Sequence, residues 1–334
     1  ARAVRHGYKP TPEERRHIVD IVARLDGLPL AIELAAARMR VLGVAQLAEH
    51  LSQRFDLLVS ADRTAPKRQA TMRAAIDWSW ELLGDWERAA LAQCSVFRGG
   101  FGLDAAAAVL DLEGIEGAPW IIDVVQALCE RSLVQAYASP NGSGELRYRL
   151  YESVREYAAE RLAAEHVGSD MGGDRGGDKP AAGDDRRRAY ERHNDYFVRL
   201  AKRAISTLGG RLTSRVVSDL ALELDNLYAV HQRCVEAGDA RSSLTIALAL
   251  EPPLLARGPL GLLARLIDGA LECARQQGLD DSLVAATILA RGHVHADLGR
   301  VELSRAERQR ALEMAQRLGD RELEGRARAS LARQ

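Results

Sequence analysis

The sequence predicts a mainly α protein: a short helical bundle, a winged-helix domain with a small β-hairpin, and an α-superhelical domain of tetratricopeptide-like repeats. Apolar residues recur at helical spacing through most of the 334 residues, and only 10 residues are prolines. One stretch near the middle of the chain has the pattern of two short strands around a turn. In the C-terminal part, similar helix ends recur about 40 residues apart, as in stacked helical hairpins.

The first part, residues 1–62, has the pattern of a helical bundle. Thr11 is a candidate N-cap for its first helix, and Glu14 lies three residues later, as a capping box requires. Gly27 ends that helix, and Pro29 suits the first position of the next one because proline lacks only an N–H that the helix does not use there.

The second part, residues 63–167, has the element order of a winged helix. Strands are expected at 133–137 and 146–150, around a turn rich in Ser, Asn and Gly. A closing helix starts near Glu152. Helices are expected before the hairpin at 71–83, 85–95, 103–110 and 121–131. Helices followed by a two-stranded hairpin and a closing helix are typical of this domain.

A linker and a repeat domain follow. Residues 168–185 hold six glycines and five aspartates, too little apolar surface to offset the entropy of ordering, so a flexible linker is expected. In residues 186–334, the segment 271–278 resembles 312–319 at an offset of 41, and Gly238 precedes Gly278 by 40. This period is longer than the 34 residues of a tetratricopeptide repeat, hence tetratricopeptide-like.

Composition excludes several classes of protein. The 46 Lys+Arg and 47 Asp+Glu leave a net charge of −1, which does not suit a general polyanion binder. No apolar run reaches the roughly 18 residues of a membrane span, so no membrane partner is expected. The four cysteines form no CxxC pair, which argues against a disulfide scaffold or a zinc site and fits the reducing cytoplasm: Cys94, Cys129, Cys234 and Cys273.

The sequence also lacks the motifs of the common catalytic sites. A P-loop needs a lysine directly after a glycine, and none of the four lysines, Lys9, Lys67, Lys179 and Lys202, follows one. GxSxG and HExxH are absent as well. We therefore predict that the chain is not an enzyme on its own, with no catalytic residue and no metal site.

Charge differs between the domains. Residues 71–165 contain eight arginines, no lysine and fifteen acidic residues, a net charge of −7. DNA affinity depends on contacts with phosphates, so direct DNA binding by this winged helix is disfavoured. Asp123 and Glu130 flank the candidate recognition helix. Residues 186–334 carry 24 basic and 19 acidic side chains, a net of +5.

Several segments together resemble one family. Arg24–Arg38 contains the sequence GLPLA and is similar to the corresponding segment of the STAND class of NTPases, signal-transducing ATPases with NB-ARC-like cores that include bacterial transcriptional regulators. The resemblance continues, in the family's order, through Arg54–Leu58, Leu82–Leu83, Ser95–Phe101, Tyr148–Ala158 and Leu222–Leu227. It implies that this chain is the C-terminal fragment of such a protein: the GLPLA lid, the winged helix and the sensor repeats.

The resemblance also implies nucleotide-contacting residues. The GLPLA proline, here Pro29, packs near the adenine in related proteins, a role compatible with its role in starting a helix. In many relatives a histidine–aspartate pair of the winged helix contacts the β-phosphate of ADP; Tyr151 and Glu152 stand at that place here. Tyr151 lacks the imidazole and either donates a hydrogen bond or packs. The P-loop and the Mg²⁺-binding strand would precede Ala1, so ADP or ATP with Mg²⁺ is expected as cofactor of the parent protein, not of this fragment.

The implied function is regulatory. The repeats would receive a protein or small-molecule signal, and the upstream P-loop domain of the same parent would respond by opening in a nucleotide-dependent way. Two alternatives remain open from the sequence: a DNA-binding winged-helix transcription regulator, and a passive tetratricopeptide-like scaffold for protein–protein interaction. The sequence does not show the output domain, the ligand of the repeats or the oligomeric state.

Overall fold

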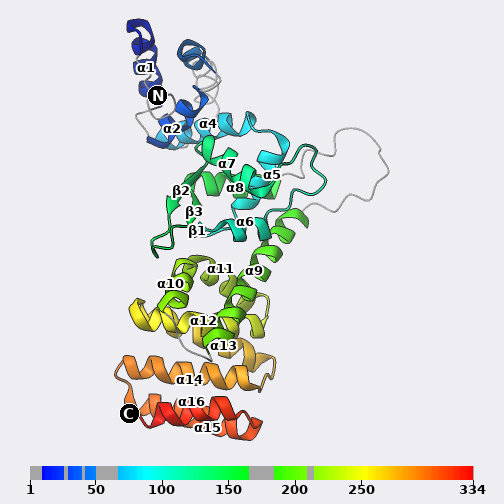
Figure 1. Ribbon diagram of the computed structural model, residues 1–334, viewed down its shortest axis with the longest axis vertical. Coiled ribbons are helices and arrows are strands. Elements are labelled where there is room, and N and C mark those ends of the chain that lie inside the picture. Colours follow the sequence, from blue (N-terminus) through cyan, green and yellow to red (C-terminus); the bar gives the residue numbers. More distant parts are fainter. Residues whose placement is uncertain are drawn as a thin grey trace. The chain divides into compact units, whose positions relative to one another are not determined.

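The chain folds into two compact units, which are described separately (Figure 1). The structure is a computed structural model and describes residues 10–25, 29–39, 42–49, 67–164, 184–208 and 214–333. The first unit comprises residues 1–96, 101–138 and 146–190. The second unit comprises residues 97–100, 139–145 and 191–334. Most of the predicted linker, 168–185, lies outside the described residues, but its last two residues, Asp184 and Asp185, already belong to a helix.

The first unit begins with the capping box that the sequence predicts. The Thr11 hydroxyl accepts a bond from the Glu14 N–H at 3.2 Å, and the Glu14 carboxylate accepts one from the Thr11 N–H at 2.8 Å. These bonds satisfy N–H groups at the start of α1 (Pro12–Arg24). Pro29 is the first residue of α2 (Pro29–Arg38), as its missing N–H favours. Residues 44–49 are also helical.

Helix α2 packs on the long helix α4 (Lys67–Glu81) in the same unit. The guanidinium of the buried Arg38 donates to the Ser79 carbonyl at 3.0 Å. Burial, with the nearby Arg131 as second cause, lowers the pKa of Arg38 to about 10. The end of the GLPLA helix is thus held by a buried charged group against α4.

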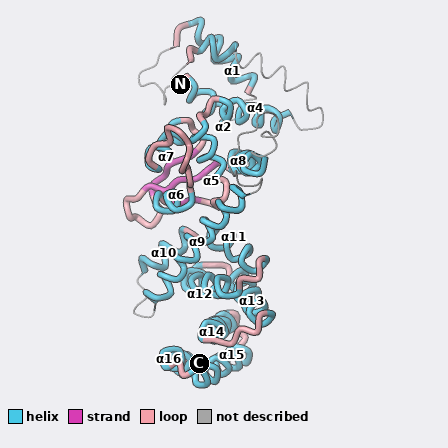
Figure 2. The backbone as a smooth tube through the Cα atoms, turned by 90° about the vertical axis from the view of Figure 1, so that its right-hand side faces the viewer, coloured by secondary structure: helices cyan, strands magenta, loops and turns pink. Residues whose placement is uncertain are grey.

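The winged-helix prediction is confirmed, with helix ends within a few residues of those expected. Strands β2 (Val134–Ala138) and β3 (Leu146–Leu150) pair antiparallel, with Val134 opposite Leu150. The helices are α5 (Asp85–Cys94), α6 (Leu103–Val109), α7 (Ile121–Glu130) and α8 (Glu152–Ala164). Figure 2 shows the small sheet in magenta among these helices.

The sheet has a third strand that the sequence did not predict. The two-residue strand β1 (Gly100–Phe101) pairs with β3, which gives the order β1-β3-β2. A strand this short carries no alternating pattern, and two adjacent glycines precede its phenylalanine. The Phe101 side chain is fully buried, so the strand anchors one edge of the sheet in the core.

The second unit consists of helical hairpins, and the predicted period of about 40 residues is confirmed. Helices α9 (Asp184–Leu208), which starts in the first unit, and α10 (Ser214–Leu222) come first. Three hairpins follow: α11 (Leu224–Glu236) with α12 (Ala240–Arg257), α13 (Leu260–Gln276) with α14 (Ser282–Asp297), and α15 (Val301–Leu318) with α16 (Arg321–Leu331). Within this unit the α14, α15 and α16 helices lie side by side in both views (Figures 1 and 2).

Two turns within the hairpins share one local geometry. At Gly238 and Gly319 the backbone has φ of 74° and 71°, the left-handed region that glycine adopts without strain. The residue after each glycine donates its N–H five positions back, from Asp239 to Cys234 at 2.7 Å and from Asp320 to Ala315 at 3.0 Å. This is the Schellman ending of a helix, and the same aspartates then cap the next helix.

Candidate functional site

The structure joins Tyr151 to the helix that begins at Pro29. Tyr151 lies half-buried between β3 and α8, and its hydroxyl donates to Glu33 Oε2 at 2.9 Å. The same hydroxyl accepts a bond from Gln135 Nε2. Burial, and then the bond to the Glu33 carboxylate, raise the pKa of Tyr151 above its ordinary value. Because Glu33 lies one turn after Pro29 on α2, the hydroxyl ties the winged helix to the GLPLA helix.

The other two predicted site residues do not share this contact. Pro29 is exposed at the start of α2. Glu152, the first residue of α8, is also exposed, and its carboxylate accepts two bonds from the Arg155 guanidinium on its own helix, one of them at 2.9 Å from Nε. Of the three residues, Tyr151 alone has a bond to α2 among the contacts of the described residues.

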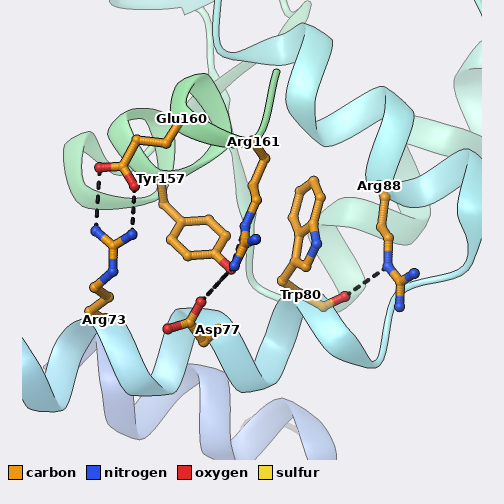
Figure 3. Close-up of polar contacts among 7 residues, drawn as sticks. All are labelled: Arg73, Asp77, Trp80, Arg88, Tyr157, Glu160 and Arg161. Atoms are coloured by element: carbon orange, nitrogen blue, oxygen red, sulfur yellow. Dashed lines mark hydrogen bonds and ion pairs between the residues drawn. The ribbon is translucent and has the colours of Figure 1, made fainter. Parts of the chain in front are cut away.

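A polar cluster between α4 and α8 was not predicted from the sequence (Figure 3). Arg73 of α4 forms a two-pronged ion pair with Glu160 of α8, at 2.6 and 3.3 Å. Tyr157 donates its hydroxyl to Asp77 Oδ1 at 2.5 Å, and Arg161 donates to the same oxygen at 2.9 Å. Asp77 therefore holds two side chains of α8 at once.

Aromatic packing reinforces this cluster. The Trp80 and Tyr157 rings meet edge to face at 5.8 Å between centroids. The Arg161 guanidinium lies over both rings, 4.8 Å from the centroid of Tyr157 and 5.7 Å from that of Trp80. Burial and the bond to Asp77 raise the pKa of Tyr157 above its ordinary value. A sequence signal existed: an aromatic and a basic residue four apart on α8, opposite Asp77 and Trp80 three apart on α4.

In the second unit, Asn226 connects two of the segments that carry the family resemblance. Its side chain is fully buried. Asn226 Oδ1 accepts the Arg98 main-chain N–H at 2.7 Å, and its Nδ2 donates to the Gly100 carbonyl at 2.8 Å and to Glu223 Oε2 at 3.1 Å. The segment Phe97–Gly100 belongs to the second unit by its contacts, although it connects α5 and α6 of the first along the chain.

His193 completes this network. Its ring lies between those of Phe97 and Phe197, at centroid distances of 5.4 and 4.7 Å. Nδ1 faces the Arg233 guanidinium at 2.8 Å and must accept, so the ring proton is on Nε2, which is 3.3 Å from Asn226 Oδ1. Burial, and then the charge of Arg233, lower the pKa of His193 to about 3, which keeps the ring neutral.

The repeats also form a cavity of about 760 Å³ that is open to solvent on one side. It lies mainly between α12 and α14, with Ile205 of α9 and Arg326 of α16 at its border. At one end the His293 Nδ1 lies 2.6 Å from Glu251 Oε1, and the His293 Nε2 lies 2.9 Å from Ser330 Oγ. These contacts link α12, α14 and α16, the second helices of the three hairpins.

The order Ser330, His293, Glu251 is that of a hydrolase triad, but the surroundings do not suit one. Ser330 is 2% exposed and does not line the cavity, so a substrate carbonyl has no access to its hydroxyl. Its carbonyl accepts a bond from the buried Arg308 at 2.8 Å, which fixes the end of α16. We interpret the trio as a structural connection between three helices.

The cysteine thiols and the possible metal ligands of the described residues also show no arrangement for catalysis. Burial raises the pKa of the Cys94 and Cys234 thiols to about 12 and that of Cys129 to about 11, so these thiols stay protonated and unreactive at neutral pH. Within the described residues, no group of three or more His, Cys, Asp or Glu side chains is arranged to hold a metal ion. In the same part of the chain, no helix is both long and apolar enough to cross a bilayer.

The candidate recognition helix α7 presents an acidic surface. Its exposed side chains are Ile122, Asp123, Gln126 and Glu130, and Trp120 just before it is 83% exposed. The sequence of α7 contains no lysine or arginine. Such a helix has no cation to place against DNA phosphates.

Comparison with known proteins agrees with the fold. The family described as "Winged helix-turn-helix domain" matches residues 83–163. A Mycobacterium tuberculosis protein that its name provisionally assigns to the HTH-type transcriptional regulators is 32% identical over 334 aligned residues, 96% of this chain and 34% of that protein. An uncharacterized protein of Mycobacterium bovis is 38% identical over 167 residues, 49% of this chain and 41% of that protein. The chain thus spans about a third of the length of the first relatives that it matches.

Among solved structures, the chain is similar to a STAND protein with a tetratricopeptide repeat sensor from Pyrococcus horikoshii. The identity is 13%, the match covers 92% of this chain and 56% of that chain, and the TM-score is 0.29. The fold and the matching family model define the class: a winged helix-turn-helix domain joined to helical repeats. The chain is homologous to proteins named as HTH-type transcriptional regulators.

Proposed function

We propose that this chain is the regulatory and sensing portion of a STAND-type ATPase, in which the repeats receive a signal and the lid and winged helix respond to the bound nucleotide. The observation that carries the proposal is the bond from the Tyr151 hydroxyl to Glu33. It links the winged helix to the GLPLA helix α2, and the resemblance implies that related proteins contact ADP at this place. In this proposal the bond helps to hold the lid closed over bound ADP.

The proposal assigns a role to Phe97–Gly100 as well. This segment is held by Asn226 of the repeats, and α5 and α6 of the winged helix continue from its two ends. A signal that moves α11 would therefore also displace Phe97–Gly100, and with this segment the ends of α5 and α6 that continue from it. Differential binding of the signal to the open state would then shift the population toward nucleotide exchange.

The test is made at Tyr151 in the longer protein that carries this chain. Tyr151→Phe removes the bond to Glu33 but keeps the ring, and we expect release of a fluorescent ADP analogue to become about three- to tenfold faster, as the loss of one hydrogen bond predicts. Tyr137→Phe on β2 is the matched control and should leave release unchanged. Unchanged release in Tyr151→Phe, with Glu33→Gln equally silent, would contradict the proposal.

A second candidate is direct DNA binding, which the winged helix-turn-helix match and the names of the relatives favour. The acidic α7 surface argues against it, and we expect no gel shift of duplex DNA by this chain at low salt, where phosphate contacts are strongest. A shift that disappears on raising the salt would favour the second candidate. A passive scaffold would differ from both, because its repeats would bind a partner equally in every nucleotide state.

A further inference from the structure

The cavity between α12 and α14 has the features of a ligand site. Its volume of about 760 Å³ is within the range of small-molecule sites, roughly 300–1,000 Å³. The wall is formed largely by apolar side chains of α12 and α14: Leu248, Pro252, Leu255, Leu283 and Ala286. Arg241 and Glu251 both line it and lie ten residues apart on α12, about 15 Å along the helix axis, so the cavity is elongated.

One polar group of the wall, the Glu251 carboxylate, has an oxygen without a hydrogen-bond partner among the described residues. The Glu251 residue is 8% exposed, and within the described residues its contact is that of Oε1 with His293. The second oxygen, Oε2, has no hydrogen-bond partner there, yet it is not among the buried atoms without one, so it reaches the cavity. A carboxylate held in an apolar wall favours a cation or a strong donor as its partner.

Arg241, Asp281 and Ser282 of the wall are already engaged. Arg241 forms an ion pair with Asp281 at 2.8 Å, and the Ser282 hydroxyl bonds to Asp320, which helps to lower the pKa of that carboxylate. Pro252 has no N–H to offer. Arg326 also lines the cavity and is exposed. Among the buried side chains of the wall, Glu251 offers a ligand an acceptor, its Oε2.

We propose that this cavity binds a small organic cation with an elongated apolar body, a primary alkylamine or a molecule of that shape, with its ammonium on Glu251 and its chain along Leu248, Leu255 and Ala286. The binding is a property of the repeats alone. Its use as the signal input rests on the proposed function.

Titration calorimetry of this chain tests the proposal with octylamine, octanol and octanoate, which share one alkyl chain and differ in head group. We expect octylamine to bind at least tenfold more tightly than octanoate, and hexylamine to bind more weakly by about fourfold per methylene removed. Glu251→Gln should reduce the preference for amine over alcohol to less than threefold. Ala286→Phe should weaken the binding of octylamine and of octanol by tenfold or more, because the larger side chain fills the cavity.

Glu302→Gln, an exposed carboxylate on α15 away from the cavity, is the matched control and should bind like the unchanged chain. Melting by circular dichroism verifies that each variant is folded, and transfer of magnetisation from octylamine to the Ala286 methyl gives a readout in the unchanged chain. Equal binding of octanoate, a retained amine preference in Glu251→Gln, or no contact with Ala286 would overturn the site. The proposed function is tested separately, by the release of the ADP analogue in Tyr151→Phe.

Discussion

Asn226 accepts the main-chain N–H of Arg98 at 2.7 Å, although the two residues are 128 positions apart in the sequence. The bond joins the start of a repeat helix to the segment between two winged-helix elements. The other half of the same amide donates to Gly100 and Glu223. Both oxygen and nitrogen of a fully buried amide are thus used, which makes the position sensitive to any change of chemistry.

Asn226→Asp tests this network with almost no change of shape. The new oxygen faces the Gly100 carbonyl and the Glu223 carboxylate, so two bonds become repulsive contacts in a buried site. We expect a loss of about 2–4 kcal/mol in the free energy of unfolding, measured with urea. Gln232→Glu, an exposed amide on the same helix, serves as control and should change stability by less than about 0.5 kcal/mol. Equal effects of the two substitutions would argue against the network.

Gly99 can be tested by a pair of substitutions. Its φ is +69°, and an added Cβ would lie 2.6 Å from Asp225 Oδ2. Gly99→Ala should therefore combine backbone strain of about 1–2 kcal/mol with a steric clash. In the double variant with Asp225→Ala the 2.6 Å contact is gone, while a tight contact with the Cβ of residue 225 at 3.3 Å and the backbone strain stay. Part of the stability should therefore return. If the loss of stability in the double variant equalled the sum of the losses in the two single variants, this geometry would be contradicted.

Local features of the fold could be predicted from the sequence, whereas its long-range contacts could not. Capping residues, helix-ending glycines and the hairpin turn act within a few positions. Thr11, Gly238 and strands at 133–137 and 146–150 were therefore predicted, and the first strand lies one residue later, at 134–138. The contacts of Asn226 with Arg98 and of Tyr157 with Asp77 join residues 128 and 80 positions apart, and no local pattern specifies them. The resemblance named the right segments, Ser95–Phe101 and Leu222–Leu227, without showing that they touch.

The candidate site follows the same division. Tyr151 was predicted from its position in a motif and stays a prediction as a nucleotide contact. Its partner Glu33 was not predicted, because the choice between hydrogen bonding and packing depends on α2. The cavity was not foreseen at all. Glu251 is followed by two prolines inside a helix, and that unusual sequence was the one local sign of a special site on α12.

Two buried histidines predict acid sensitivity of the repeats. Burial lowers the pKa of His193 to about 3 and that of His231 to about 4, whereas both unfolded side chains titrate near 6.5. Between about pH 6.5 and 4 the unfolded chain therefore binds more protons, and stability falls as the pH falls, with a slope of up to about 1.4 kcal/mol per pH unit for each histidine. Urea unfolding between pH 7.5 and 4.5 measures this slope.

His231→Gln separates the two histidines. A glutamine N–H can still donate to the Leu266 carbonyl that His231 Nε2 contacts at 2.9 Å, and it does not titrate. We expect the variant to lose about half of the slope between pH 6.5 and 4.5, with a modest change at pH 7.5. An unchanged slope would mean that His231 is accessible to protons in the folded chain.

The cluster between α4 and α8 predicts two unequal effects. Asp77→Ala leaves the Tyr157 hydroxyl and the Arg161 guanidinium without their shared acceptor, and we expect a loss of about 2–3 kcal/mol in the free energy of unfolding. Arg73→Ala removes an exposed ion pair with Glu160, for which about 0.2–1 kcal/mol is expected. Thermal melting of the two variants side by side measures the difference, and a larger effect of Arg73→Ala would contradict this order.

The Schellman endings at Gly238 and Gly319 have an evolutionary consequence. The main-chain bonds that close each turn lie within a few residues of it. A duplicated hairpin of about 40 residues brings its own stop and start signals and can be added to the array without redesigning the hairpins beside it. Relatives could therefore change the number of repeats, and with it the reach of their binding face, by copying whole units of DNA.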